Sequence, residues 1–407
     1  MSVGESGVIT VDEARNIAIR FIEGGRYDCE NPDPHGPQLS DHHHEYYLDG
    51  KAMAYEFPLT KNGNEQGYLL LSGYRGRQPI LEYTSTGGSL RTTLNDCLRG
   101  LLNRLNILSV DIQWIYYGPL DIVAEVKMQN GKFLYARLPN IKYLESKEKI
   151  PFQAAPLSDE EWVAGRWRFY EGHDRSTAFR PCSKMFGYSA PLYNQTCYGS
   201  LLEIDILHTN NYCTPQCIVG CVATAWAMLA GTFESGVVTG KIYADSPDWQ
   251  GSWQSSYGSP PPPGSIGVNR HMWNVNSYMG TTCAGNTSDS NTIAGSRLFR
   301  DFGVDWYWGS KTNADYSFAA LINKNGYPFL LTAQSTWVPG EIDGHGVVVH
   351  GYNDNDAHLY ITRGWGRAFP DVWIAFSSLS QVSVFFRAKP PASPAESDPT
   401  TALPFVL

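Results

Sequence analysis

Residues 220–228 read GCVATAWAM, and they open the part of the chain that decides its fold. Gly220 ends an irregular stretch, and the run CVATAWAMLAGTF over residues 221–233 predicts a helix whose Ala, Trp and Met side chains pack into a core. Cys221 then lies in the first turn, where the positive end of the helix dipole favours a thiolate. Such a cysteine suits nucleophilic catalysis; the alternative interpretation is a small buried residue at a helix start.

A second motif, DGHGVVVHGY, covers residues 343–352. Its valines predict a buried strand, and the glycines on both sides of His345 leave room for a substrate. An imidazole held at the start of a strand suits the general base that a catalytic cysteine requires. Either His345 or His350 is alternatively an ordinary core histidine. Further on, residues 362–366 read TRGWG, where the indole of Trp365 would keep water away from a Cys–His ion pair.

The runs GCVATAWAM, GHGVVVHGY and GWG, in this order and separation, resemble the streptopain-like cysteine peptidases of the papain-like clan. The resemblance implies that Cys221 is the nucleophile, His345 the general base and Trp365 the shield of the pair. It also implies a glutamine in the oxyanion hole. In APLYNQ, residues 190–195, this position is Gln195, with Tyr193 where the family has tryptophan, and the Cys221 backbone N–H is the second donor.

The chain departs from this family at the group that orients the histidine. The family has an asparagine where this sequence has Thr362, whose hydroxyl would take over the role. Other possible substitutes are Asp343, Asn353 and Asp354. The glycine after His345 stands where the family usually has alanine or serine, which we interpret as a mild change.

The amino-terminal part predicts a separate α+β unit. Residues 8–24, VITVDEARNIAIRFIEG, have helical spacing after Thr10, an N-cap with Glu13 three residues later. Residues 46–87 predict an antiparallel meander with Asp-Gly, Asn-Gly and Ser-Gly turns. A helix near residues 91–107 and the strand-like runs DIVAEVKM and KFLYARLP follow. GYLLLSG and PILEYTSTG within the meander resemble strands of the family's inhibitory prosegment, which implies that this unit covers the site until it is cut away.

The expected fold class is α+β, with a papain-like peptidase domain of helix and antiparallel sheet after an α+β prosegment. The predicted boundaries are 8–140 for the prosegment-like domain, 141–185 for a charged linker, 186–388 for the peptidase domain and 389–407 for a disordered tail. Within the linker we predict a processing site near Lys142, Lys147 and Lys149.

Composition excludes several other classes of protein. The 407 residues are 42% hydrophobic and 17% charged, so most of the chain should fold. A formal net charge of −9, without a long Lys/Arg cluster, argues against a nucleic-acid partner. No apolar run is long enough for a membrane span, and the amino terminus shows no signal peptide, although the resemblance implies secretion.

The cysteines cluster, with five of the eight between Cys182 and Cys221. A zinc site from Cys197, Cys213, Cys217 and His208 is conceivable, but the Cys-x-x-Cys spacing is missing. We therefore expect no metal and no cofactor. A Cys213–Cys217 or Cys197–Cys213 disulfide is the alternative if the protein is exported. The three consecutive histidines His42, His43 and His44 predict a solvated turn that binds metal weakly at most.

These observations predict a cysteine endopeptidase, made as a zymogen, that hydrolyses polypeptides through a thioester and binds its own prosegment. Two alternatives stay open. One is a pseudoprotease or binding protein on the same fold, and the other is a different Cys-dependent acyl transfer such as deamidation or transpeptidation.

Overall fold

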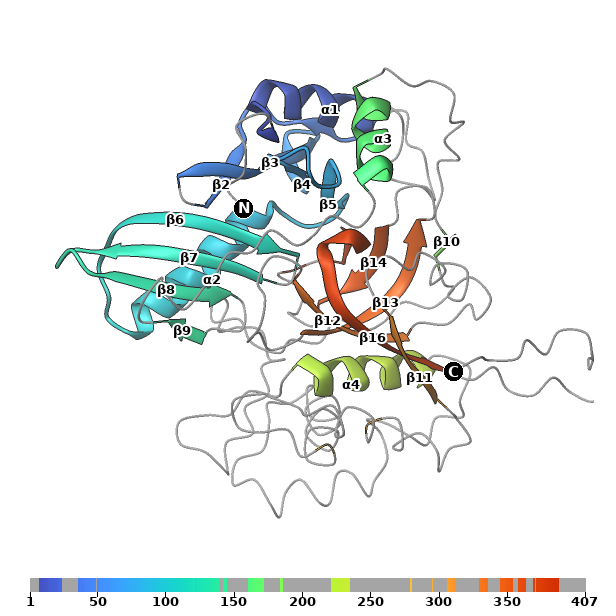
Figure 1. Ribbon diagram of the computed structural model, residues 1–407. Coiled ribbons are helices and arrows are strands. Elements are labelled where there is room, and N and C mark those ends of the chain that lie inside the picture. The colour runs from blue at the N-terminus through green and yellow to red at the C-terminus, as the bar shows by residue number, and fades with distance from the viewer. Residues whose placement is uncertain are drawn as a thin grey trace, which may run out of the picture.

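The structure is a computed structural model. It describes residues 7–23, 36–48, 50–119, 121–138, 142–144, 160–171, 184–185, 221–234, 279, 295, 306–311, 329–335, 345–353, 358–363, 369 and 371–387. We call residues 7–144 the N-terminal unit and residues 221–387 the C-terminal unit. The described part combines helices with antiparallel sheets, as the α+β class predicts (Figure 1).

The helices are α1 (Val11–Glu23), α2 (Leu90–Arg104), α3 (Glu160–Tyr170) and α4 (Cys221–Glu234), with a short 3₁₀ turn η4 (Phe376–Ser378). The N-terminal unit has the strands β1 (Gln38–Leu39), β2 (His44–Leu48), β3 (Lys51–Lys61), β4 (Asn64–Ser72), β5 (Ile80–Thr84), β6 (Ser109–Gly118), β7 (Asp121–Met128), β8 (Phe133–Leu138) and β9 (Lys142–Leu144). After β10 (Lys184–Met185), the C-terminal unit has β11 (Trp306–Lys311), β12 (Phe329–Ser335), β13 (His345–Asn353), β14 (His358–Thr362), β15 (Val372–Ala375) and β16 (Leu379–Arg387).

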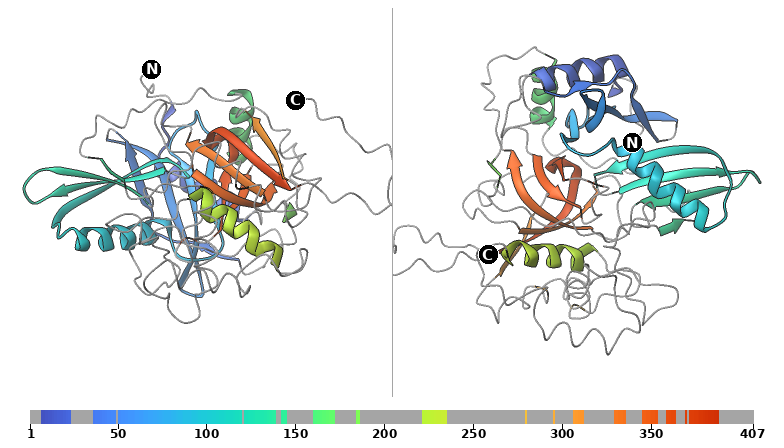
Figure 2. Two further views of the ribbon diagram at one scale, coloured as in Figure 1. Left: turned by 90° about the horizontal axis from the view of Figure 1, so that it is seen from below. Right: turned by 180° about the vertical axis from the view of Figure 1, so that it is seen from behind.

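One antiparallel sheet runs through both units. Among the described strands its order is β1-β3-β4-β5-β15-β14-β13-β12-β16-β11, with β2 on β3 and β10 on β13. The two units join where β5 pairs with β15, with Tyr83 opposite Trp373 and Glu82 opposite Ile374. We call this junction the seam. The strands β6-β7-β8-β9 form a second sheet, which projects to one side of the molecule in Figure 1 and Figure 2.

Local sequence accounts for the first elements of the N-terminal unit. Glu13 accepts a hydrogen bond from the Thr10 backbone N–H at 2.7 Å, and its own N–H donates to Thr10 Oγ1 at 3.2 Å, so the predicted capping box begins α1. The Asn-Gly turn between β3 and β4 has φ of 53° at Asn62 and 79° at Gly63, the left-handed conformation of a tight hairpin turn. Both predictions are confirmed.

The core is built on both faces of the N-terminal strands. Helices α1 and α3 cover one face, where Phe21 and Trp167 pack in a cluster with Phe57 and Leu69. This layer is at the top of Figure 1. Helix α2 packs with the second sheet in another cluster, which continues into the C-terminal strands. Because β3 and β4 are buried on both faces, their sequences are nearly continuous apolar runs.

Parts of the predicted linker are ordered by the N-terminal unit. Lys142 belongs to β9 and pairs with Arg137 on β8. Residues 160–170 form α3, whose Trp167 donates from Nε1 to the Arg77 carbonyl at 2.7 Å. Tyr170 accepts from Arg20 through its carbonyl at 3.0 Å. Proteolytic processing at Lys142 is therefore disfavoured. Residues 145–159, which include Lys147 and Lys149, lie outside the described residues.

Candidate functional site

Cys221 is the first residue of α4, as predicted. The helix is apolar on every side, and Ala223, Trp226 and Leu229 are fully buried. Cys221 itself is a reduced thiol with 8% of its surface exposed. The unpaired N–H groups of a first helical turn and the helix dipole both favour negative charge at this position, which is the requirement for a thiolate.

His345 is the first residue of β13 and lies opposite Ala333 on β12. Its side chain is 2% exposed, and Nε2 lies 3.0 Å from the carbonyl oxygen of Arg363. A carbonyl oxygen can only accept a hydrogen bond, so Nε2 carries the hydrogen. In the neutral imidazole, Nδ1 is then the basic nitrogen.

The segments that carry these two residues lie against each other. Helix α4 packs on β12 and β13. A Cβ atom added to Gly346 would lie 2.9 Å from Val222 Cα and 3.1 Å from Val222 N. The residue after the histidine is thus in backbone contact with the residue after the cysteine. The structure therefore brings together the start of α4 and the start of β13, the elements that carry the predicted nucleophile and general base. The close approach leaves no room for a Cβ atom at position 346, so glycine is required there and is more than the mild change expected from the sequence.

The orienting contact to His345 comes from the residue after Thr362. Thr362, the last residue of β14, donates from Oγ1 to Asp371 Oδ1 at 2.5 Å. Asp371 in turn accepts at its backbone oxygen from Thr84 Oγ1 of the N-terminal unit, at 2.9 Å. The Thr362 hydroxyl, predicted as the orienting group, therefore takes part in contacts at the seam. The imidazole is held by the Arg363 carbonyl instead.

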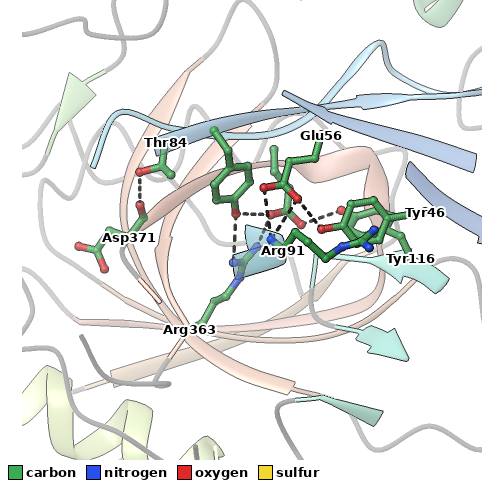
Figure 3. Close-up of polar contacts among 9 residues, drawn as sticks. Tyr46, Glu56, Thr84, Arg91, Tyr116, Arg363 and Asp371 are labelled. Atoms are coloured by element: carbon green, nitrogen blue, oxygen red, sulfur yellow. Dashed lines mark hydrogen bonds and ion pairs between the residues drawn. The ribbon is translucent and has the colours of Figure 1, made fainter. Parts of the chain in front are cut away.

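Arg363 is also the centre of a buried polar cluster that crosses the seam (Figure 3). Its guanidinium forms an ion pair with Glu82 of β5, and the two side chains are 1% and 0% exposed. Tyr68 and Tyr116 donate to the Glu82 carboxylate at 2.8 Å and 2.7 Å. Burial opposes the charge of Arg363, but the Glu82 carboxylate outweighs this effect and raises the pKa of Arg363. The charges thus compensate each other in the interior.

A second buried carboxyl group, Glu56 on β3, lies beside this cluster in Figure 3. Its Oε2 accepts from Tyr46 Oη at 2.5 Å and from the Arg91 backbone N–H at 3.1 Å, in the first turn of α2. Burial raises the pKa of Glu56 to about 7. Glu56, Glu82 and Arg363 are not among the site residues predicted from the sequence. The available signal was an acidic residue inside each short apolar run, EFPL and PILEYT.

The remaining predicted site residues are not described. Gln195, Trp365, Asp343 and Asp354 lie outside the described residues, as do the side chains of His350 and Asn353. The same holds for the zinc and disulfide candidates Cys197, Cys213, Cys217 and His208. In the part of the chain that is described, no group of three or more His, Cys, Asp or Glu side chains is arranged to hold a metal ion.

No described helix has the length and apolar character needed to cross a membrane. Comparison with known proteins adds no relative: no family model matches the chain, and no curated protein matches it significantly.

Proposed function

We propose that the protein is a cysteine peptidase of papain-like type that acts through Cys221 and His345. The observation that supports the proposal is the close approach of Gly346, which follows His345, to Val222, which follows Cys221. The tautomer set by the Arg363 carbonyl supports it, because Nδ1 is then the basic nitrogen, the kind of group that takes the proton of a catalytic thiol.

In this mechanism the Cys221 proton moves to His345 Nδ1, and the thiolate attacks the scissile carbonyl carbon. The tetrahedral oxyanion accepts hydrogen bonds from the Cys221 backbone N–H and, as the resemblance implies, from Gln195. Collapse of this intermediate breaks the C–N bond, and the imidazolium gives its proton to the leaving amine. A water molecule, deprotonated by the imidazole, then hydrolyses the thioester and regenerates the thiol.

The test is hydrolysis of a fluorescently labelled, unfolded polypeptide by the full chain. Cys221→Ala and His345→Gln should each lower the rate by about 10³-fold or more. His358→Gln is the matched control, because His358 is a buried histidine of the same sheet that bonds the Ile80 carbonyl instead. An epoxide inhibitor should label Cys221. Unchanged hydrolysis by Cys221→Ala would contradict the proposed role of Cys221 as the nucleophile.

A second candidate, a binding protein on the same fold, is favoured by the seam, since the N-terminal unit shares a sheet with the candidate site. Iodoacetamide distinguishes the two. A catalytic Cys221 should alkylate faster than the other thiols near neutral pH, whereas a structural thiol should not. Product masses separate hydrolysis from transpeptidation or deamidation, the other acyl transfers open to this pair.

We also propose that the protein works in an oxidising compartment and is secreted. Cys97 on α2 is disulfide-bonded, and such bonds persist outside the reducing cytosol. Its substrates would be polypeptides. The resemblance implies in addition that residues 8–140 are an inhibitory prosegment, and this stays a prediction.

A further inference from the structure

We propose that Glu82 of the N-terminal unit is a positioning residue for His345, acting through Arg363. The inference rests on the proposed function, since it assigns a role in that same site. It makes the N-terminal unit a supporting part of the site, the opposite of the inhibitory role that the resemblance implies.

Arg363 lies directly after the last residue of β14. The β13–β14 ladder ends with Thr362 opposite Val348, so Arg363 is the first residue beyond the paired strand. Its carbonyl points at His345 Nε2, 3.0 Å away. The position of this carbonyl therefore depends on what holds the rest of Arg363.

The side chain of Arg363 is held through both terminal nitrogens of its guanidinium. One terminal nitrogen forms the ion pair with Glu82, and the other donates to Tyr68 Oη at 3.4 Å. With 1% of the side chain exposed, water cannot replace these partners. The guanidinium thus anchors the residue on one side, while its carbonyl holds the imidazole on the other.

Glu82 is itself held in place by hydrogen bonds and by strand pairing. Its carboxylate receives a phenol hydrogen bond on each oxygen, from Tyr68 on β4 and Tyr116 on β6. The strand that carries it is paired on both sides, with β4 and with β15. Three strands of the N-terminal unit therefore determine where the Arg363 guanidinium can lie, and through it the Arg363 carbonyl.

The test uses the full chain carrying Glu82→Gln, with isotope-labelled histidine. In the wild type, the Nε2–H proton of His345 should give a slowly exchanging signal in the NMR spectrum, identified by its loss in His345→Gln. Glu82→Gln should shift this signal or bring it into fast exchange. It should also lower kcat about 100-fold with little change in KM, the effect of a misplaced catalytic group.

Further variants keep the test decisive. Gln78→Ala removes a different buried seam contact, between Gln78 and His358, and should leave the His345 signal and kcat unchanged. Tyr116→Phe removes a single donor to Glu82 and should lower kcat about fivefold even if Glu82→Gln does not fold. In the Arg363→Gln background, Glu82→Gln should have no additional effect on the His345 signal, because its action passes through Arg363.

The outcomes separate this inference from the proposed function. A folded Glu82→Gln protein with an unchanged His345 signal and unchanged kcat would overturn the positioning role. So would an unchanged His345 signal in Tyr116→Phe. If the wild type hydrolyses no polypeptide, the proposed function fails, while the NMR arm still decides whether Glu82 positions the imidazole.

Discussion

At the scale of single residues, Gly346 sets how closely the start of β13, with the candidate base, approaches the start of α4, with the candidate nucleophile. A Cβ atom there would lie 2.9 Å from Val222 Cα, in the backbone of α4, which cannot rotate away. Gly346→Ala should therefore push the start of α4 from β13. We expect a loss of about 1–3 kcal/mol in the free energy of unfolding and a fall of at least about 10-fold in peptide hydrolysis.

Gly165→Ala is the matched control for this prediction. Gly165 lies inside α3, and apart from its chain neighbours and the backbone of its own helix, no described atom lies within 4 Å of the position that its Cβ would take. Alanine there should raise the free energy of unfolding by about 0.5–1 kcal/mol and leave hydrolysis unchanged. Urea unfolding and the hydrolysis assay measure both variants. Equal activity of Gly346→Ala and wild type would contradict a close helix–strand contact at the site.

Some residues of the candidate site lie in motifs that can be recognised in the sequence, and others do not. Cys221 and His345 lie in local motifs whose glycines, apolar runs and positions at the start of an element are visible along the chain. The pairing of Glu82 with Arg363 joins residues that are 281 positions apart, and no local pattern records it. A lone charge in an apolar run signals that a buried partner is needed, but does not say which residue it is.

At the scale of elements, Glu56 joins β3 to the start of α2 and makes this contact sensitive to pH. Its pKa is raised from 4.5 to about 7 by burial, so the folded state binds its proton more tightly than the unfolded chain does. The stability that this proton supplies is complete below about pH 4.5 and is lost as pH rises through about 7. Glu56→Gln should remove this dependence.

The measurement is urea unfolding of wild type and Glu56→Gln at a series of pH values from 4 to 8. The quantity to compare is the difference between the two proteins in the free energy of unfolding at each pH. The wild-type curve alone is not enough, because His44 changes stability with pH in the opposite direction. Burial lowers the pKa of His44 from 6.5 to about 4, so its contribution to stability is lost as pH falls through that range. If the wild-type minus variant difference is flat between about pH 4.5 and 7, Glu56 is not the titrating group.

Prediction of the elements succeeded where the signal is local. The capping box of α1, the Asn-Gly hairpin and the Val-rich β13 each depend on neighbouring residues, and all are present. Helix α3 falls in the predicted linker, whose sequence is charged and irregular. It is ordered by tertiary contacts instead, as Arg75 lies over the Trp167 ring at 5.3 Å and bonds Glu171. Local patterns do not contain such contacts.

At the scale of the whole molecule, the seam makes one sheet from what sequence alone divides into two domains. An edge strand offers the same unpaired backbone groups to any partner, so its own sequence does not say which strand will pair with it. Side chains strengthen the junction here. Tyr83 stacks on Trp373 with ring centres 5.8 Å apart, and His358 donates from Nε2 to the Ile80 carbonyl at 3.0 Å.

The seam predicts what a cut in the linker does. A recognition sequence for a specific protease, inserted between residues 148 and 152, would allow cleavage without touching any described element. The two pieces should still elute together in gel filtration, because strand pairing, the stacked rings and the buried ion pair all cross the seam. Separating them would leave the Arg363 and Glu82 charges without their partners, at a cost of about 3–5 kcal/mol.

The control is the same cut protein with Glu82→Gln and Trp373→Ala, which should elute as separate pieces if the seam is what holds them. Pieces that separate in native buffer without these substitutions would contradict the seam and restore the removable prosegment that the resemblance implies. Activity gives an independent comparison. If the N-terminal unit positions His345, hydrolysis should persist in the associated cut protein and fall when the variant pieces separate, whereas release of an inhibitor would make it rise.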